Sequence, residues 1–411
     1  MFVKFITLCL LLSGCASVTK SHLDDVQKSF SHGDFETVTK DKDIKNENNL
    51  DLLIDATALF HENKFSESDA AFEEFNKRNL HETSSSILRE TSGLLFGNGV
   101  NSYKPYMMDS LFVSYYQIWN LLALQDWSNV RVVINQSYNR QQNMSIEYKK
   151  LIEENKDKLS KNSQLQEILD KNQNDWAAFT DIMNPALMYL SGIYFLNDGD
   201  FENAEIYLKR ANGMMGNNTF IQTDLKLAQQ HKKPKNTTWV FYESGFAPRL
   251  QEKDFSFYVP KIGLVYFSFS EPYFDQSTPT PPNSQLLADV DKMFLTEYNE
   301  YRTNEILRSY TSAISKTAMQ ATMYNSHSDS ASLLGLLSTV YTATSSNTDV
   351  RTWATLPKNI YVQRIDRTKQ NITQNDFIDD DIKLKLKNSD NNLIYIREHN
   401  TITDKKFINL K

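Results

Sequence analysis

The chain of 411 residues contains two cysteines, Cys9 and Cys15. A thiol can form a disulfide, bind a metal, act as a nucleophile or carry a lipid, so these residues decide which chemistry is open. Cys9 lies in an apolar run, residues 5–12, that follows Lys4 and is typical of a secretory signal. Once such a leader is removed, one cysteine remains, which excludes an internal disulfide, a cysteine metal site and a cysteine nucleophile.

The residues before Cys15 suggest that this cysteine carries a lipid. Leu12-Ser13-Gly14-Cys15 resembles the lipobox of bacterial lipoproteins, in which the leader, here residues 1–14, is cut before the cysteine. Several acyl chains, at about 0.8 kcal/mol per buried CH₂, would hold the chain on a membrane. Ala16 follows rather than aspartate, which in a Gram-negative host indicates the periplasmic face of the outer membrane. The alternative is an ordinary secretory leader with a chance cysteine.

The other familiar arrangements for catalysis are missing from the sequence. It contains no His-Glu-x-x-His pair, no Gly-x-Ser-x-Gly elbow and no glycine-rich loop that ends in Gly-Lys-Ser/Thr. We therefore expect no cofactor, no metal and no enzymatic activity. The net charge of −7 and the lack of a clustered basic face argue against binding to nucleic acid. The seven histidines are scattered singly, at His22, His32, His61, His81, His231, His327 and His399.

One further pair of residues could have a special role. Arg351 and Trp353 are two positions apart, so on an extended strand they point to the same face. A guanidinium can stack there on an indole. Core packing at the start of a C-terminal sheet explains the pair equally well.

Residues 15–230 predict a helical domain in which a turn pattern recurs. Glycine and proline are scarce, and each turn lies between two apolar runs at helical spacing. Small residues such as Gly192 and Ala204 would let two helices approach closely, as in tetratricopeptide repeats. An array of helical hairpins without repeat ancestry is the alternative, and residues 145–176 predict a long helix or hairpin. The four turns are HGDF (32–35), ENKF (62–65), LQDW (124–127) and DGDF (198–201).

The pattern changes at residues 231–238, which we interpret as a linker. Residues 239–411 predict a smaller domain that mixes antiparallel strands with helices, so the fold class is α+β. Aromatic and β-branched residues alternate over 237–250 and 254–274, which favours strands. Helices are expected over 284–323 and 331–343, and the C-terminal tail predicts four short strands. These tail strands are NIYVQRI, DIKLKLK, NLIYIRE and KFINLK.

Three segments, residues 183–211, 239–252 and 349–365, resemble a family of bacterial lipoproteins with tetratricopeptide-like repeats and a β-containing C-terminal part. We refer to them as the three motif segments. The resemblance covers most of the chain from residue 90 onward, implies that architecture and implies no reaction. The residues that carry it are Asn184, Pro185, Tyr189, Leu190 and Gly192, then Glu243, Gly245, Ala247 and Pro248, then Arg351, Trp353, Leu356, Pro357 and Arg364.

These observations predict a membrane-anchored scaffold. Lipid on Cys15 would bind the membrane, and the helical domain would bind a protein of the cell envelope, in work such as envelope assembly. The alternative is an envelope enzyme, or a protein that binds glycan or peptidoglycan, with its site in the C-terminal domain.

Overall fold

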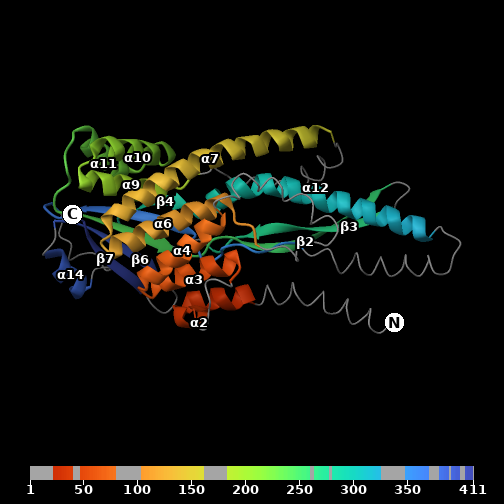
Figure 1. The fold of residues 1–411 in the computed structure, drawn as a ribbon, viewed down its shortest axis with the longest axis horizontal. Helices are drawn as coiled ribbons and strands as arrows, with labels where there is room; N and C mark the ends of the chain where they lie inside the picture. Colours follow the sequence, from red (N-terminus) through yellow and green to blue (C-terminus); the bar gives the residue numbers. More distant parts are fainter. Residues whose placement is uncertain are drawn as a thin grey trace.

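The structure is a computed structural model, and Figure 1 shows its arrangement. The predicted leader, Cys15 and the apolar run 331–343 lie outside the described residues. The structure describes residues 22–39, 47–79, 103–161, 183–259, 263–276, 280–324, 348–369, 379–387, 390–398 and 403–410.

The N-terminal half is helical, as predicted, and each of the four turn patterns joins two helices. Whether these pairs are tetratricopeptide repeats stays a prediction. The long helix expected over 145–176 belongs to one that starts at Trp127, and residues 162–176 lie outside the described part. After a helix over 22–32, the elements are α2 (Phe35–Thr39), α3 (Asn49–His61), α4 (Phe65–Asn79), α6 (Met107–Ala123), α7 (Trp127–Ser160), α9 (Pro185–Asp198), α10 (Phe201–Met214) and α11 (Thr219–Gln229).

The pair α9 and α10 shows how the sequence sets this geometry. The side chain of Asn184 accepts a hydrogen bond from the Leu187 amide at 3.1 Å, and Pro185 follows in the first turn, so α9 begins here. Gly199 ends the helix with a φ of +87°. A Cβ on Gly192 would lie 2.7 Å from the Leu208 side chain, so only glycine permits this approach of α10.

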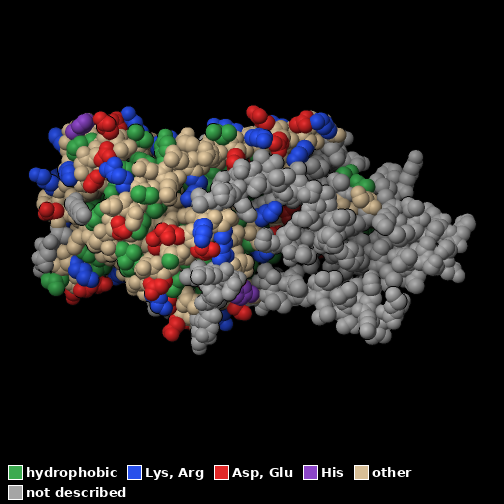
Figure 2. Space-filling view, viewed as in Figure 1, with side chains coloured by type: hydrophobic (Ala, Val, Ile, Leu, Met, Phe, Trp, Pro, Cys, Tyr) green, Lys and Arg blue, Asp and Glu red, His purple; other side chains and the backbone are tan. Residues whose placement is uncertain are grey.

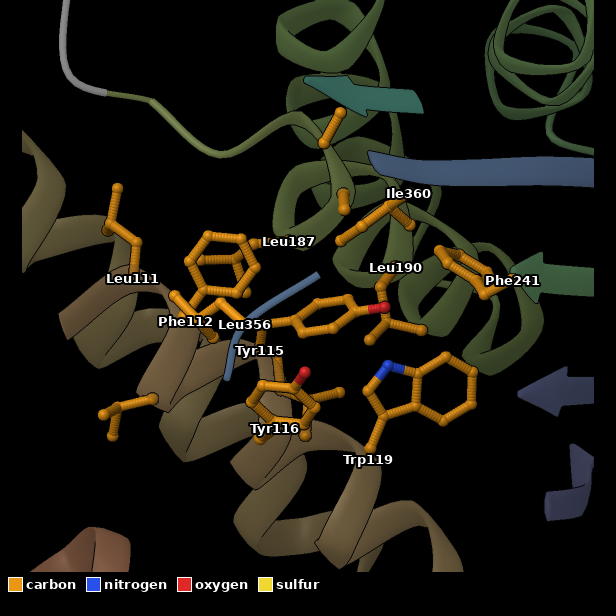
Figure 3. Close-up of a cluster of buried hydrophobic side chains, with 14 of the residues drawn as sticks. Leu111, Phe112, Tyr115, Tyr116, Trp119, Leu187, Leu190, Phe241, Leu356 and Ile360 are labelled. Carbon is orange, nitrogen blue, oxygen red and sulfur yellow. The ribbon is translucent and has the colours of Figure 1, made fainter. Parts of the chain in front are cut away.

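Helix α6 is the centre of the molecule. Its side chains are buried on all sides, which is typical of a helix inside a core. In Figure 3, Tyr115 and Trp119 of α6 lie among Leu190 of α9, Phe241 of the sheet and Leu356. The Trp119 ring packs edge-on against Phe241, with the ring centroids 5.3 Å apart.

The C-terminal half contains a five-stranded sheet with the order β4-β5-β1-β6-β7. We expected an antiparallel sheet, but β1 and β6 run parallel, so the sheet is mixed. The chain leaves β5, passes β1 and enters β6 from the same end, which makes β6 antiparallel to β5 and therefore parallel to β1. The strands are β1 (Thr237–Ser244), β4 (Gln285–Asp289), β5 (Asn359–Asp366), β6 (Asn391–Glu398) and β7 (Thr403–Leu410).

Both faces of this sheet are buried, and alternate residues of β1 show it. Trp239 and Phe241 join the main hydrophobic core with the helices. Val240 and Tyr242 join a second cluster on the opposite face. The main core includes residues from Val26 to Leu410, so the predicted linker at 231–238 marks a change from helix to strand within one continuous core. The first strand already begins at Thr237.

The second cluster is covered by α14 (Asp380–Lys387), where the sequence analysis wrongly predicted a strand. The Ile382 amide donates to the Asp379 carboxylate at 3.0 Å, which starts the helix. Ile382 and Leu386, four residues apart, both face the sheet. Lys385 pairs with Asp381 at 2.7 Å on the outside.

A separate hairpin, β2 (Arg249–Val259) and β3 (Gly263–Tyr273), lies beside α12 (Val290–Tyr324). The helix predicted from residue 284 starts later, because β4 first pairs with β5 over residues 285–289. In Figure 1, the hairpin, α12 and the end of α7 extend away from the sheet. In the part of the chain described here, none of the helices is both long and apolar enough to cross a bilayer.

Candidate functional site

The structure brings the three motif segments together. Strand β1 of the second segment pairs antiparallel with β5 of the third, and Trp239 lies opposite Arg364. Beyond the strands, the Ala247 amide donates to the Leu356 carbonyl at 2.8 Å. The Thr352 hydroxyl donates to the Pro248 carbonyl at 3.2 Å. Gly245, with a φ of +65°, makes the turn between β1 and this contact.

All three segments also meet at Asp224 of α11, which is completely buried. Its carboxylate accepts hydrogen bonds from the Tyr189 hydroxyl, the Trp239 indole and the Arg364 guanidinium, each at 2.7 Å. Burial and the Asp224 charge raise the pKa of Tyr189 well above its usual value, so the hydroxyl stays protonated and donates. This set of contacts, which we name the Asp224 centre, is closed to solvent and joins α9, α11, β1 and β5.

A second buried set surrounds Glu243 of β1, and we name it the Glu243 centre. The carboxylate accepts from the hydroxyls of Tyr116 at 3.0 Å and Tyr395 at 2.7 Å. Arg397 lies 3.2 Å away and also donates to the Thr355 carbonyl at 2.7 Å. Burial raises the pKa of Glu243, while Arg397 and the tyrosine hydroxyls act in the opposite direction. No side chain of this centre is open to a substrate.

The pair Arg351 and Trp353 is not arranged as we expected. Residues 348–353 form an irregular segment and not a strand, so the argument from a shared strand face fails. Arg351 makes a two-point ion pair with Asp349, at 2.7 Å for each contact. Trp353 is buried and packs near Phe72, with ring centroids 6.2 Å apart. Leu190, Leu356 and Pro357 are buried as well, so these motif residues contribute to the core.

A third buried cluster joins the helices to the last strand. The His61 ring of α3 lies 2.8 Å from the Asp404 carboxylate of β7 and stacks on Phe35 with centroids 4.8 Å apart. Lys406 lies 3.0 Å from the same carboxylate and 4.6 Å from the centre of the Phe60 ring. Burial lowers the pKa of His61 from 6.5 to about 4, against the opposing effect of Asp404.

This shift predicts a loss of stability in acid. Because the pKa of His61 is lower in the folded chain than in the unfolded chain, the unfolded chain binds the proton first as the pH falls below 6.5. The unfolding free energy should therefore drop by about 3 kcal/mol between pH 6.5 and pH 4 on account of this group. Urea denaturation measured over this range should show a smaller drop for His61→Asn than for the unmodified chain. Parallel curves for the two proteins would contradict the prediction, and exposed His231→Asn serves as the control.

Within the described residues, an open groove of about 750 Å³ runs along α4, α6 and α7. Helix α6 lies between α4 and α7 in Figure 1 and contacts both helices. Its residues Ser110, Gln117 and Leu121 form the floor of the groove. The wall from α4 carries Asp69, Ala70, Glu73, Glu74, Asn76, Lys77 and Asn79, and the wall from α7 carries Asn129, Val132, Val133, Gln136, Asn139, Arg140 and Asn143.

Amide side chains dominate the groove. Gln136, Asn139 and Asn143 lie on one face of α7 and have no hydrogen-bond partner within the described residues. Gln117 bridges the floor and the α4 wall, since it accepts from Asn76 at 2.9 Å and donates to Asp69 at 3.1 Å.

The acidic groups of the groove gather on α4. Asp69, Glu73 and Glu74 contribute three carboxylates, with Lys77 as the one basic residue of that wall. Burial raises the pKa of Asp69 to about 6, although the Gln117 amide opposes the shift. Arg140 on α7 donates to the Ser110 carbonyl at 3.2 Å and to the Ser114 hydroxyl at 3.1 Å, so it is held at the floor.

Neither this groove nor either of the two acidic centres is among the sites predicted from the sequence. For the groove a signal existed, because Asn129, Gln136 and Asn143 recur every seven residues and so share one face of a helix. For Asp224 there was no such signal, since its donors lie 15, 35 and 140 positions away in the chain. Within the described ranges, no group of three or more metal-ligating side chains occurs.

On the face of the molecule that Figure 2 shows, the described residues carry basic and acidic side chains in a mixed distribution, without a large patch of one sign. The buried centres thus hold the fold together, and the groove is the open surface with a distinct chemical character. Comparison of the chain with protein-family models, curated proteins and solved structures finds no match, so the family resemblance rests on the motif segments and the lipobox residues alone and stays a prediction.

Proposed function

We propose that the chain is a non-enzymatic, lipid-anchored scaffold of the cell envelope that binds a polypeptide segment of a protein partner in the groove. The groove supports this proposal, because its volume is that of a site for a ligand of substantial size and its polar groups point into it. Lipid on Cys15 would hold the chain on a membrane, which in a Gram-negative host is the outer membrane facing the periplasm. A role in envelope assembly would fit this location at the membrane.

The amides favour a polypeptide as the ligand. An asparagine or glutamine side chain offers a carbonyl acceptor and NH₂ donors, which match the N–H and C=O groups of a peptide backbone. Gln136, Asn139 and Asn143 offer these groups in a row along α7. Among the described residues that line the groove, none is an aromatic residue that could stack on the face of a sugar, so these residues favour a polypeptide over a glycan.

The charges favour a basic residue in the bound segment. The α4 wall carries three carboxylates, and the Asp69 carboxyl is protonated below a pH of about 6. A lysine or arginine of the partner would pair with this wall, and binding should weaken as the pH falls from 7 to 5. The net charge of −7 and the mixed surface of Figure 2 make nucleic acid a poor partner.

The test is site-specific photo-crosslinking in cells with the full-length protein. A photoreactive amino acid at Asn139 should capture a discrete partner, and the same amino acid at Leu384, an exposed residue of α14 outside the groove, should not. Asp69→Asn and Glu73→Gln together should reduce the yield at Asn139 by about tenfold, since two charge-assisted contacts are worth at least 1.4 kcal/mol. The Cys15→Ser form should lose the adduct as well.

Two outcomes would refute the proposal. Equal labelling from Asn139 and Leu384 would mean that the groove has no ligand. A partner captured unchanged by the Cys15→Ser form and by the charge variant would mean that neither the anchor nor the acidic wall contributes.

A further inference from the structure

The hairpin of β2 and β3 has a base that is fixed and a tip that is not covered. At the base, Ser270 donates to Glu305 of α12 from its amide at 3.2 Å and from its hydroxyl at 2.6 Å. The Tyr298 hydroxyl of α12 donates to the Ser270 carbonyl at 2.5 Å, and Phe269 is completely buried. The base is therefore a rigid support that holds the strands in one direction.

Toward the tip, one face of the hairpin presents large apolar side chains to water. Tyr258 is 70% exposed, Tyr266 is 63% exposed and Leu264 is 49% exposed. Tyr258 lies opposite Leu264, and Tyr266 lies opposite Ser256 two positions farther from the turn, so the three side chains share a face. We name these three residues the hairpin tip.

Charged residues are scarce toward the tip. Neither strand carries a charge over 255–259 or 263–270, and Lys261, which stands between the two strands in the sequence, is the one charged residue from 255 to 270. Near the base the charges are matched within the hairpin, where Lys253 pairs with Glu271 at 2.7 Å. Exposed aromatic and aliphatic side chains without charge mark a surface that is covered in the working protein.

We propose that the hairpin tip inserts into the interfacial layer of the membrane that holds the lipid anchor. Tyrosine is enriched at this layer, since its ring contacts acyl chains while its hydroxyl remains at the headgroups. Insertion of a few such side chains needs no spanning helix. The inference rests on the proposed anchor at Cys15.

The position of the N-terminal helix supports the membrane as the occupant. The helix over 22–32 packs at the hairpin base, where Asp24 accepts from Arg249 at 3.3 Å. Leu23, Leu250 and Tyr273 line one cavity of about 270 Å³ at this junction. The anchor chain therefore enters the described part beside the root of the hairpin.

Measured from this junction, the extended anchor chain and strand β2 have similar lengths. The chain from Cys15 to residue 22 spans at most about 25 Å when extended. Strand β2, from Arg249 to Val259, spans about 34 Å. The difference, about 10 Å, is close to the depth of the interfacial layer, so the lipid and the tip can reach the same leaflet.

The mature chain offers a direct test, because it contains no cysteine other than Cys15, whose thiol carries the lipid. Tyr258→Cys gives the full-length lipoprotein a single free thiol, which is labelled with an environment-sensitive fluorophore. The protein is placed in vesicles of phosphatidylethanolamine and phosphatidylglycerol that contain doxyl-labelled lipid as a quencher. Leu384→Cys on α14, 60% exposed and far from the hairpin in Figure 1, is the matched control.

We expect the label at position 258 to lose about half of its emission to the doxyl lipid, because it lies within the interfacial layer, and the label at 384 to lose little. Tyr266→Cys should behave like Tyr258→Cys. Equal and weak quenching at positions 258 and 384 would overturn the inference. Shielding of the tip only when an envelope protein is added, without quenching by lipid, would assign the tip to a protein and overturn it as well.

Failure of the anchor itself is seen separately. If the unlabelled full-length protein does not float with membranes in a density gradient, the proposed lipid anchor is wrong. If it floats and the tip is not quenched, the anchor stands and only the insertion of the tip is wrong.

Discussion

Asp224→Ala should lower the unfolding free energy by about 3–5 kcal/mol, because it leaves the Arg364 guanidinium, whose side chain is only 10% exposed, without its counter-charge. The same change removes the acceptor of the Tyr189 hydroxyl and of the Trp239 indole. Each unsatisfied donor adds a desolvation cost of about 1–3 kcal/mol where water cannot enter. Urea denaturation of the mature chain, followed by far-UV circular dichroism, measures the loss.

Two matched variants separate the charge from the packing. Tyr189→Phe removes one donor and keeps the ring, so it should cost about 1 kcal/mol. Asp126→Ala removes a half-buried aspartate at the start of α7, where its carboxylate accepts from the Asn129 amide at 3.2 Å, and should also cost about 1 kcal/mol. A loss for Asp224→Ala no larger than these two would show that the Asp224 centre does not join the three motif segments.

The elements of this fold were predictable where a single local pattern decides the structure. The period-two alternation of NIYVQRI and NLIYIRE predicts strands, and β5 and β6 are found there. DIKLKLK alternates in the same way, but an Asp379 cap and the pair Ile382 and Leu386 make it a helix. A short segment can fit both the period of a strand and the period of a helix. The surface that it covers then decides its secondary structure, and the sequence does not show that surface.

The parallel pairing of β1 and β6 could not be predicted from the sequence, for a related reason. A strand pattern gives the faces of a strand but not its neighbour or its direction. Strands β2 to β5 and helix α14 lie between β1 and β6 in the chain. The pairing of β6 with β1 is therefore a contact between residues about 150 positions apart. The strand order of the sheet is selected only when the whole hydrophobic core assembles.

The motif residues were found by sequence, but their roles were not. Tyr189, Trp239 and Arg364 stand in three separate segments, and only the fold makes Asp224 their shared acceptor. Arg351 and Trp353 show the opposite case. Their spacing in the sequence suggested that the two side chains stack on each other. The backbone of 348–353 is irregular, however, and Arg351 pairs with Asp349 instead. The residues that carry the family resemblance therefore stabilise the packing of the helices against the sheet. The groove lies on helices outside the motif segments.

The Glu243 centre predicts an effect that depends on its partner. Glu243→Leu alone should lower the unfolding free energy by about 3–5 kcal/mol, because Arg397 is then a buried charge without a counter-charge. Adding Arg397→Met removes that charge. The double variant should therefore lose about 2 kcal/mol less than the sum of the two single losses. Chemical denaturation of the four proteins gives this coupling energy directly.

A surface pair provides the comparison that makes the result specific. Lys385 and Asp381 on α14 are also 2.7 Å apart but largely exposed, so the same cycle with Lys385→Met and Asp381→Leu should give a coupling of about 0.5 kcal/mol or less. Tyr116 and Tyr395 lose their acceptor in the double variant, which should keep it below the unmodified chain in stability. A coupling at Glu243 no larger than on α14 would mean that water reaches the buried pair. In that case α6 and the sheet would be joined by apolar packing alone.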